Sequence, residues 1–203
     1  MQNRGKIYIA SMVMRGDWAP RPIGSKVINV TSMQKKSSQF RIDFSPMHLE
    51  EYKGYACFEN YWQGGKVYEG IDPEVSHFWW LKQITGKRKY PAGKGHRVLY
   101  GIYEDNVARD YLSARKNIYV KNYFELVKDR NSIDICRQYL DNGIDITIYD
   151  FDGPKTESGE ITCLELDDTV LGDKLNDTSY PFGHGYVVGA ILLGLSVEEL
   201  LAL

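Results

Sequence analysis

Cysteine is scarce in this sequence. Cys57, Cys136 and Cys163 are far apart, and no C-x-x-C pair occurs. This spacing argues against a zinc site and against a complete disulfide framework, and unpaired thiols are typical of a reducing compartment. We therefore predict a cytoplasmic protein that holds no metal and no cofactor.

Long apolar runs are also absent. No stretch approaches the ~18 residues that a helix needs to cross a bilayer. No apolar segment of a signal peptide follows the basic Arg4 and Lys6. We therefore expect neither a membrane span nor a signal peptide.

Net charge is small, at -2 with a pI near 6.1, which does not support a generally basic nucleic-acid coat. Basic charge is nevertheless concentrated in residues 82–97, which contain six Lys or Arg and no acidic residue. We interpret this segment as a solvated face of the fold. The alternative is a loop that contacts phosphates, in which Tyr90 and His96 lie between the cations.

Aromatic residues, in contrast, are abundant, with 15 Tyr, 7 Phe and 4 Trp. Such a load predicts either a tyrosine-lined core or a site that stacks planar ligands, and composition does not choose between them. The apolar share of 43% and the charged share of 26% are those of an ordinary globular protein.

Hydrophobic periodicity predicts a mixed chain. Alternation predicts strands over residues 6–12, 26–32, 98–103 and 144–148. Capping and breaking residues predict helices over residues 72–86, which Asp72 and Pro73 begin, and over residues 106–114, 118–128 and 132–142. Ser132 is the expected N-cap of the helix over residues 132–142. The apolar residues 186–195 predict a buried helix, and Ser196 with Glu199 predicts a capping box at the start of a final short helix. The pattern indicates an α+β fold in one domain over residues 1–203.

An apolar strand ends in Asp150-Phe151-Asp152-Gly153, which matches the nucleophile motif of haloacid-dehalogenase-type phosphatases. Only about fifty residues follow, too few for the strand–helix units that carry the other motifs of that fold. We therefore interpret the motif as a strand end that turns through Asp and Gly.

A second motif, Gly183-His184-Gly185, precedes the buried apolar helix. The backbone N–H groups of this segment and the positive end of the helix dipole could bind an anion. The alternative is that the two glycines simply allow a tight turn before a buried helix. A lone histidine such as His184 is more often a structural hydrogen-bonding residue than a catalyst.

A third segment, residues 58–68, places Glu59, Trp62, Gln63 and Lys66 on one face if it is helical. Gly64 and Gly65 weaken that helix, which predicts the close approach of another element or of a ligand. The alternative is a helix that is simply packed by Tyr61 and Trp62.

These segments together resemble the NADAR family, whose characterised members are N-glycosidases associated with NAD and ADP-ribose metabolism. Residues 59–67 reproduce the Glu, Tyr, Gln and Lys of the family's central motif at the same spacing, and residues 176–185 resemble its N-D-x-x-W-G-x-G segment. The resemblance implies helices packed around a small mixed sheet. It also implies hydrolysis of a base–ribose bond in an ADP-ribosylated nucleobase or a related glycoside, free or carried on DNA or RNA.

The resemblance also implies the roles of particular residues. An oxocarbenium-like sugar needs a carboxylate near C1′ and the leaving base needs stacking surfaces. The carboxylates would be Glu59 and Asp177, and the stacking rings Trp62, Tyr180 and Phe182. Lys66, beside Gln63, would contact a ribose hydroxyl or a phosphate, and a second phosphate would lie at the turn of Gly183, His184 and Gly185.

Three departures from the family pattern leave other functions open. Asn60 replaces the motif histidine, Phe182 replaces the tryptophan after an inserted Pro181, and residues 187–188 lack the usual Lys-Asn. Residues 72–103 have no clear counterpart. The alternatives are a binding module that sequesters ADP-ribose or another NAD-derived nucleotide without turnover, and a nucleic-acid-binding protein that uses residues 82–97.

Overall fold

The computed structural model describes residues 3–13, 15–83 and 92–203. Strands and helices are mixed, and the sheet is a small mixed one, so the predicted α+β class is confirmed. Residue contacts group into two compact units: unit 1, Met1–Ser45 with Val120–Leu203, and unit 2, Pro46–Tyr119. The single domain stays a prediction.

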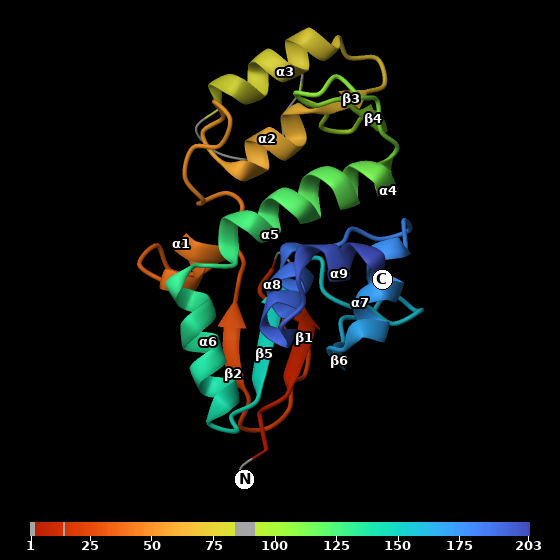
Figure 1. Ribbon diagram of the computed structural model, residues 1–203. Helices are drawn as coiled ribbons and strands as arrows, with labels where there is room; N and C mark the ends of the chain where they lie inside the picture. Colours follow the sequence, from red (N-terminus) through yellow and green to blue (C-terminus); the bar gives the residue numbers. More distant parts are fainter. Residues whose placement is uncertain (1–2, 14, 84–91) are drawn as a thin grey trace. The chain divides into compact units, whose positions relative to one another are not determined.

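Unit 1 is built on a four-stranded sheet in the order β2-β5-β1-β6 (Figure 1). The strands are β1 (Ile7–Ser11), β2 (Lys26–Asn29), β5 (Ile146–Asp150) and β6 (Cys163–Glu165). Strand β5 pairs in parallel with both β1 and β2, whereas β6 runs antiparallel to β1. The three parallel strands therefore present their carboxyl ends, at Ser11, Asn29 and Asp150, along one edge of the sheet.

Helix α8 (His184–Leu193) packs on β1 and β5 of this sheet. Its residues from 184 to 192 are all buried, as expected of a helix that is apolar on every side, and Gly194 ends it in a left-handed conformation. The other unit 1 helices are α1 (Gln39–Phe44), α5 (Lys121–Val127), α6 (Asn131–Asp141), α7 (Asp168–Asn176) and α9 (Val197–Ala202). No helix formed by the described residues is long and apolar enough to cross a membrane.

Unit 2 combines two packed helices with a short antiparallel sheet. Helix α2 (Phe58–Gly64) packs on α3 (Pro73–Lys82), and β3 (Lys66–Tyr68) pairs with β4 (Val98–Gly101), which contacts α4 (Tyr111–Ala114). A π-helical segment, Arg115–Val120, follows α4 in the chain. The core is mainly aromatic and includes Phe58, Tyr61, Trp62, Tyr68, Trp80 and Tyr103.

The structure corrects several predicted boundaries. The helix expected from residue 106 begins only at Tyr111, with Asp110 as its cap, and the helix of residues 58–68 ends at Gly64, which places Lys66 on a strand. Helix α6 begins at Asn131, and Ser132 does not cap it because its hydroxyl donates to Asp43 Oδ2 at 2.6 Å. The Asp72 cap and the Ser196 capping box are confirmed.

Candidate functional site

The Glu59 segment is held in unit 2 by apolar burial and by one long-range backbone bond. Phe58, Tyr61 and Trp62 are buried, and the Glu59 backbone N–H donates to Pro46 O at 2.9 Å. Glu59 lies in the first turn of α2, where the positive end of the helix dipole favours a carboxylate. Its side chain is half-buried.

A chain of hydrogen bonds connects three of the predicted site residues. Lys66 Nζ donates to Gln63 Oε1 at 3.0 Å, and Gln63 Nε2 donates to Glu59 Oε1 at 2.8 Å. The Tyr68 hydroxyl lies 3.3 Å from the same Gln63 Oε1. The ammonium of Lys66 can only donate hydrogen bonds, so the Gln63 amide must turn its oxygen toward Lys66 and its NH₂ group toward Glu59. The position of Lys66 therefore determines how the amide holds the Glu59 carboxylate.

The Trp62 ring packs within unit 2. It stacks on Tyr103 with ring centroids 5.9 Å apart and contacts Tyr119 at 5.0 Å, and Lys66 Nζ lies 4.4 Å from its centroid. Only 7% of Trp62 is exposed. This arrangement agrees with the alternative interpretation, in which the ring packs the helix, and stacking on a ligand stays a prediction.

The close approach predicted at Gly64 and Gly65 is confirmed. A Cβ on Gly64 would lie 2.6 Å from Tyr55 Cε1, and one on Gly65 would overlap the ring of Tyr103. Gly65 has φ −79° and ψ −6°, a conformation open to any residue, so proximity to the ring explains this glycine. The two tyrosines thereby lie directly against the backbone where α2 ends.

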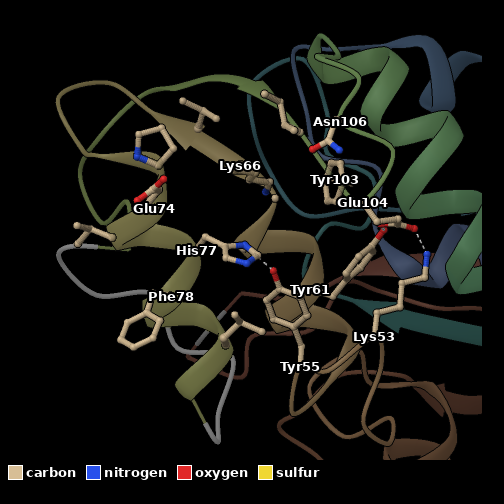
Figure 2. Close-up of a pocket in the computed structure, with 17 residues that line it drawn as sticks. Lys53, Tyr55, Tyr61, Lys66, Glu74, His77, Phe78, Tyr103, Glu104 and Asn106 are labelled. Carbon is tan, nitrogen blue, oxygen red and sulfur yellow. Dashed lines mark hydrogen bonds and ion pairs between the residues drawn. The ribbon is translucent and has the colours of Figure 1, made fainter.

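A cavity of about 920 Å³ opens in unit 2 beside these tyrosines (Figure 2). The residues that line it come from the segment before α2, from α2 and β3, from α3 and from the loop after β4; they include Lys53, Tyr55, Tyr61, Lys66, Glu74, His77, Phe78, Tyr103, Glu104 and Asn106. Glu59 is not among the lining residues. Lys66 belongs both to this lining and to the chain that holds Glu59.

Two hydrogen-bonded groups fix the rings of the cavity. Tyr55 Oη lies 2.8 Å from His77 Nδ1, and the Tyr61 hydroxyl donates to Glu104 Oε2 at 2.7 Å. Glu104 also forms an ion pair with Lys53. Burial raises the pKa of Tyr55 to about 12, and burial together with Glu104 raises that of Tyr61, so both hydroxyls stay protonated at neutral pH. Burial alone would raise the pKa of Glu104, but the hydrogen bonds from Lys53 and Tyr61 outweigh it and lower that pKa.

The predicted residues from the C-terminal segment lie in unit 1. Asp177 ends α7, and its Oδ1 accepts hydrogen bonds from the Ser179 backbone N–H at 2.8 Å and from the Ser179 hydroxyl at 2.5 Å. Tyr180 is 47% exposed. Phe182, in contrast, is 4% exposed and stacks on Tyr186 with centroids 5.0 Å apart. Of the two unit 1 rings, Tyr180 is the one that offers surface to a ligand.

The Gly183-His184-Gly185 turn contacts the side chain of Asp150 from within unit 1. The Gly185 N–H donates to Asp150 Oδ2 at 2.7 Å, and His184 Nδ1 lies 3.4 Å from the same oxygen. His184 Nε2 lies 3.0 Å from Val30 O. Asp150 is fully buried, and its carboxyl group lies at the N-terminal end of α8. The expected phosphate at this turn stays a prediction.

Asp150 is the residue whose role the sequence analysis missed. The sequence feature that could have indicated this role is the position of Asp150 at the end of β5. All five residues of this strand are buried, and a buried carboxylate needs a hydrogen-bonding partner inside the protein. Asp150 Oδ2 has that partner, whereas Oδ1 has no hydrogen bond from the described residues. The cavity residues Tyr55, His77, Tyr103 and Glu104 were missed as well, because they belong to no recognisable motif.

The predicted site residues thus divide between the two units: Glu59, Trp62, Gln63 and Lys66 come together in unit 2, and Asp177, Tyr180, Phe182, Gly183, His184 and Gly185 lie in unit 1. A common site for the two groups stays a prediction. Half of the basic segment, residues 84–91, lies outside the described residues. Of its remainder, Arg97 forms an exposed ion pair with Glu69 at 3.2 Å.

The described residues contain no group of three or more His, Cys, Asp and Glu side chains placed to hold a metal ion. Comparison of the chain with protein-family models, with curated proteins and with solved structures found no match in any of the three.

Proposed function

We propose that this protein is an N-glycosidase that hydrolyses the base–ribose bond of an ADP-ribosylated nucleobase or a related nucleotide glycoside, with Glu59 as its catalytic carboxylate. The observation that carries the proposal is the chain from Lys66 through Gln63 to Glu59, in which a half-buried carboxylate is held by an amide of fixed orientation. Preorganised carboxylates of this kind suit reactions that develop positive charge on a sugar.

The chemistry requires one water and no other reactant. The C1′–N bond breaks, its electron pair stays on the base nitrogen, and C1′ acquires oxocarbenium character. Glu59 stabilises that charge and accepts a proton from the water that attacks C1′. The base nitrogen takes a proton from solvent, the ribose gains a hydroxyl at C1′, and Glu59 returns to solvent the proton that it accepted, so that the net change is the addition of one water.

Gln63 and Lys66 act as positioning residues in this proposal. The amide holds one oxygen of Glu59 at 2.8 Å, and the ammonium, buried against Trp62, prevents the amide from rotating. A misplaced catalytic group loses much of its rate advantage, so loss of either contact reduces turnover more than substrate binding.

The proposal retains Asp177 as a second carboxylate and Tyr180 as a stacking ring. It includes a cytoplasmic location, because the three cysteines are all unpaired, and two of them, Cys57 and Cys136, are buried. Burial raises the pKa of Cys136 to about 12, which makes this thiol unreactive at neutral pH.

The experiment compares the wild type with Glu59→Gln and with the matched control Glu51→Gln, which removes an exposed carboxylate from the same unit. Each protein is incubated with ADP-ribosylated guanosine and related nucleotide glycosides, and free base is measured by chromatography. We expect release by the wild type and the control and a loss of at least 100-fold in Glu59→Gln. Release of base by a folded Glu59→Gln protein at the wild-type rate contradicts the assignment of Glu59.

A second candidate, a binding module without turnover, is favoured by one set of observations. Phe182 replaces the tryptophan of the resembled motif and residues 187–188 lack its Lys-Asn, so the chain keeps the carboxylate Glu59 without every residue that the resemblance associates with turnover. Calorimetry with ADP-ribose distinguishes the two functions. Tight binding without release of base from any glycoside supports the binding module, and turnover excludes it.

A further inference from the structure

We propose that the cavity of unit 2 is a binding site for an uncharged, planar heteroaromatic ligand of nucleoside size that carries amino or ring N–H donors. This site is separate from the proposed catalytic carboxylate, because Glu59 does not line it. The inference therefore stands whether or not the protein is an N-glycosidase.

The volume and the rings of the cavity set the size and the shape of the ligand. About 920 Å³ is near the upper end of the range for sites that take ligands of drug or nucleoside size. Tyr61 contacts both Tyr55 and Tyr103, with ring centroids 5.8 Å and 5.4 Å apart. Rings fixed in this way stack a flat ligand without first losing conformational freedom.

Three polar groups of the lining supply hydrogen-bonding capacity. Within the part of the chain that the structure describes, no hydrogen bond engages His77 Nε2, the Asn106 side-chain amide or the Glu74 carboxylate. Figure 2 shows Glu74 and His77 on α3 across from Tyr103, Glu104 and Asn106. A carboxylate and an amide oxygen accept hydrogen bonds from N–H groups, so the ligand must offer such donors on its ring.

Charge in the lining is balanced, which selects an uncharged ligand. The two ammonium groups, Lys53 and Lys66, are matched by the carboxylates of Glu74 and Glu104, and Glu104 already pairs with Lys53. A phosphorylated ligand would bring charge that the walls do not compensate.

Exposed apolar side chains at the cavity support the binding of a ligand there. Val75 and Phe78 of α3, which line it, are 49% and 57% exposed. Trp80 of the same helix, in contrast, is fully buried. Large apolar side chains that gather at a concave surface are typical of a site that a ligand covers.

The test is calorimetric titration of adenosine, guanosine and cytidine into Glu59→Gln protein, so that hydrolysis cannot obscure binding. Two variants remove ligand contacts, Glu74→Gln and Phe78→Ala, each made in the Glu59→Gln background. Their matched controls are Glu51→Gln and Val107→Ala, which change an exposed carboxylate and an exposed apolar side chain of unit 2 outside the lining. Circular dichroism confirms that every variant is folded.

We expect saturable binding of at least one nucleoside, weakened at least tenfold by Glu74→Gln and by Phe78→Ala and unchanged in the controls. Absence of saturable binding up to millimolar nucleoside overturns the proposal. Equal binding of toluene and of the nucleosides, with no effect of Glu74→Gln, also overturns it, since the cavity would then recognise only apolar surface. Because Glu59 is absent throughout, neither result bears on the glycosidase proposal.

Discussion

Replacement of Gly65 by alanine tests how closely Tyr103 packs on the backbone at the end of α2. The added Cβ would overlap the Tyr103 ring, and that ring has little freedom to move. It is 6% exposed, stacks on Trp62, and anchors its hydroxyl to Trp62 O at 3.0 Å. Relief of the overlap therefore requires the ring to leave its stack and its hydrogen bond.

The expected loss of stability follows from these contacts. Overpacking of a tight site costs about 1–3 kcal/mol, and the displaced hydrogen bond and ring stack add about 1 kcal/mol each. The backbone opposes this loss by up to about 1 kcal/mol, because the α-region φ of Gly65, −79°, suits alanine. The free energy of unfolding should therefore fall by about 2–4 kcal/mol.

The assay is urea unfolding followed by tryptophan fluorescence, which reports mainly on unit 2 because only Trp18 lies outside it. Gly172→Ala is the matched control. Gly172 lies inside α7, where a Cβ would make an ordinary contact 3.4 Å from Leu203 Cβ. Followed by circular dichroism, this control should be neutral or more stable by up to about 1 kcal/mol. Equal effects of the two substitutions would refute the packing argument.

Three further outcomes are expected. Lys66→Met should lower kcat about 10- to 100-fold with little change in KM, and Lys66→Arg should restore part of it; an unchanged kcat contradicts the positioning role. Ser196→Ala should lower the free energy of unfolding by about 1 kcal/mol through loss of its capping box, and no loss of stability in denaturant unfolding contradicts the cap. The hydrogen bond from Arg109 lowers the pKa of Asp105 to about 2, so the stabilisation is present above the ordinary value of 3.8 and is lost as pH falls toward 2. In thermal unfolding, Asp105→Asn should therefore weaken the fall in Tm across this window, and an unchanged slope refutes the linkage.

Much of the fold could be predicted from local chemistry. Alternating apolar residues gave the parallel strands, and the capping side chains of Asp72 and Ser196 marked two helix starts, because these signals act within one or two turns of the chain. Ser132 failed as a predicted cap because Asp43, 89 residues away, takes its hydroxyl. A competing partner so distant in sequence leaves no local pattern.

The candidate site shows the same division. The spacing of Glu59, Gln63 and Lys66 predicted one polar face, and the hydrogen bonds among these side chains agree with it. The packing of Trp62 could not be predicted from residue spacing, because Tyr103 and Tyr119, which contact its ring, are distant from it in the sequence. The carboxylate that occupies the turn before α8 was likewise hidden, since it comes from the end of a strand in the middle of the sheet.

The most direct test of the central claim is a single-turnover assay with enzyme in excess over ADP-ribosylated guanosine, in which free base is measured over time for the wild type and Glu59→Gln. The account predicts first-order release by the wild type and a rate at least 100-fold lower in Glu59→Gln, with both proteins equally folded. Equal rates for the two proteins, or no release by the wild type from any glycoside of the panel, would contradict it.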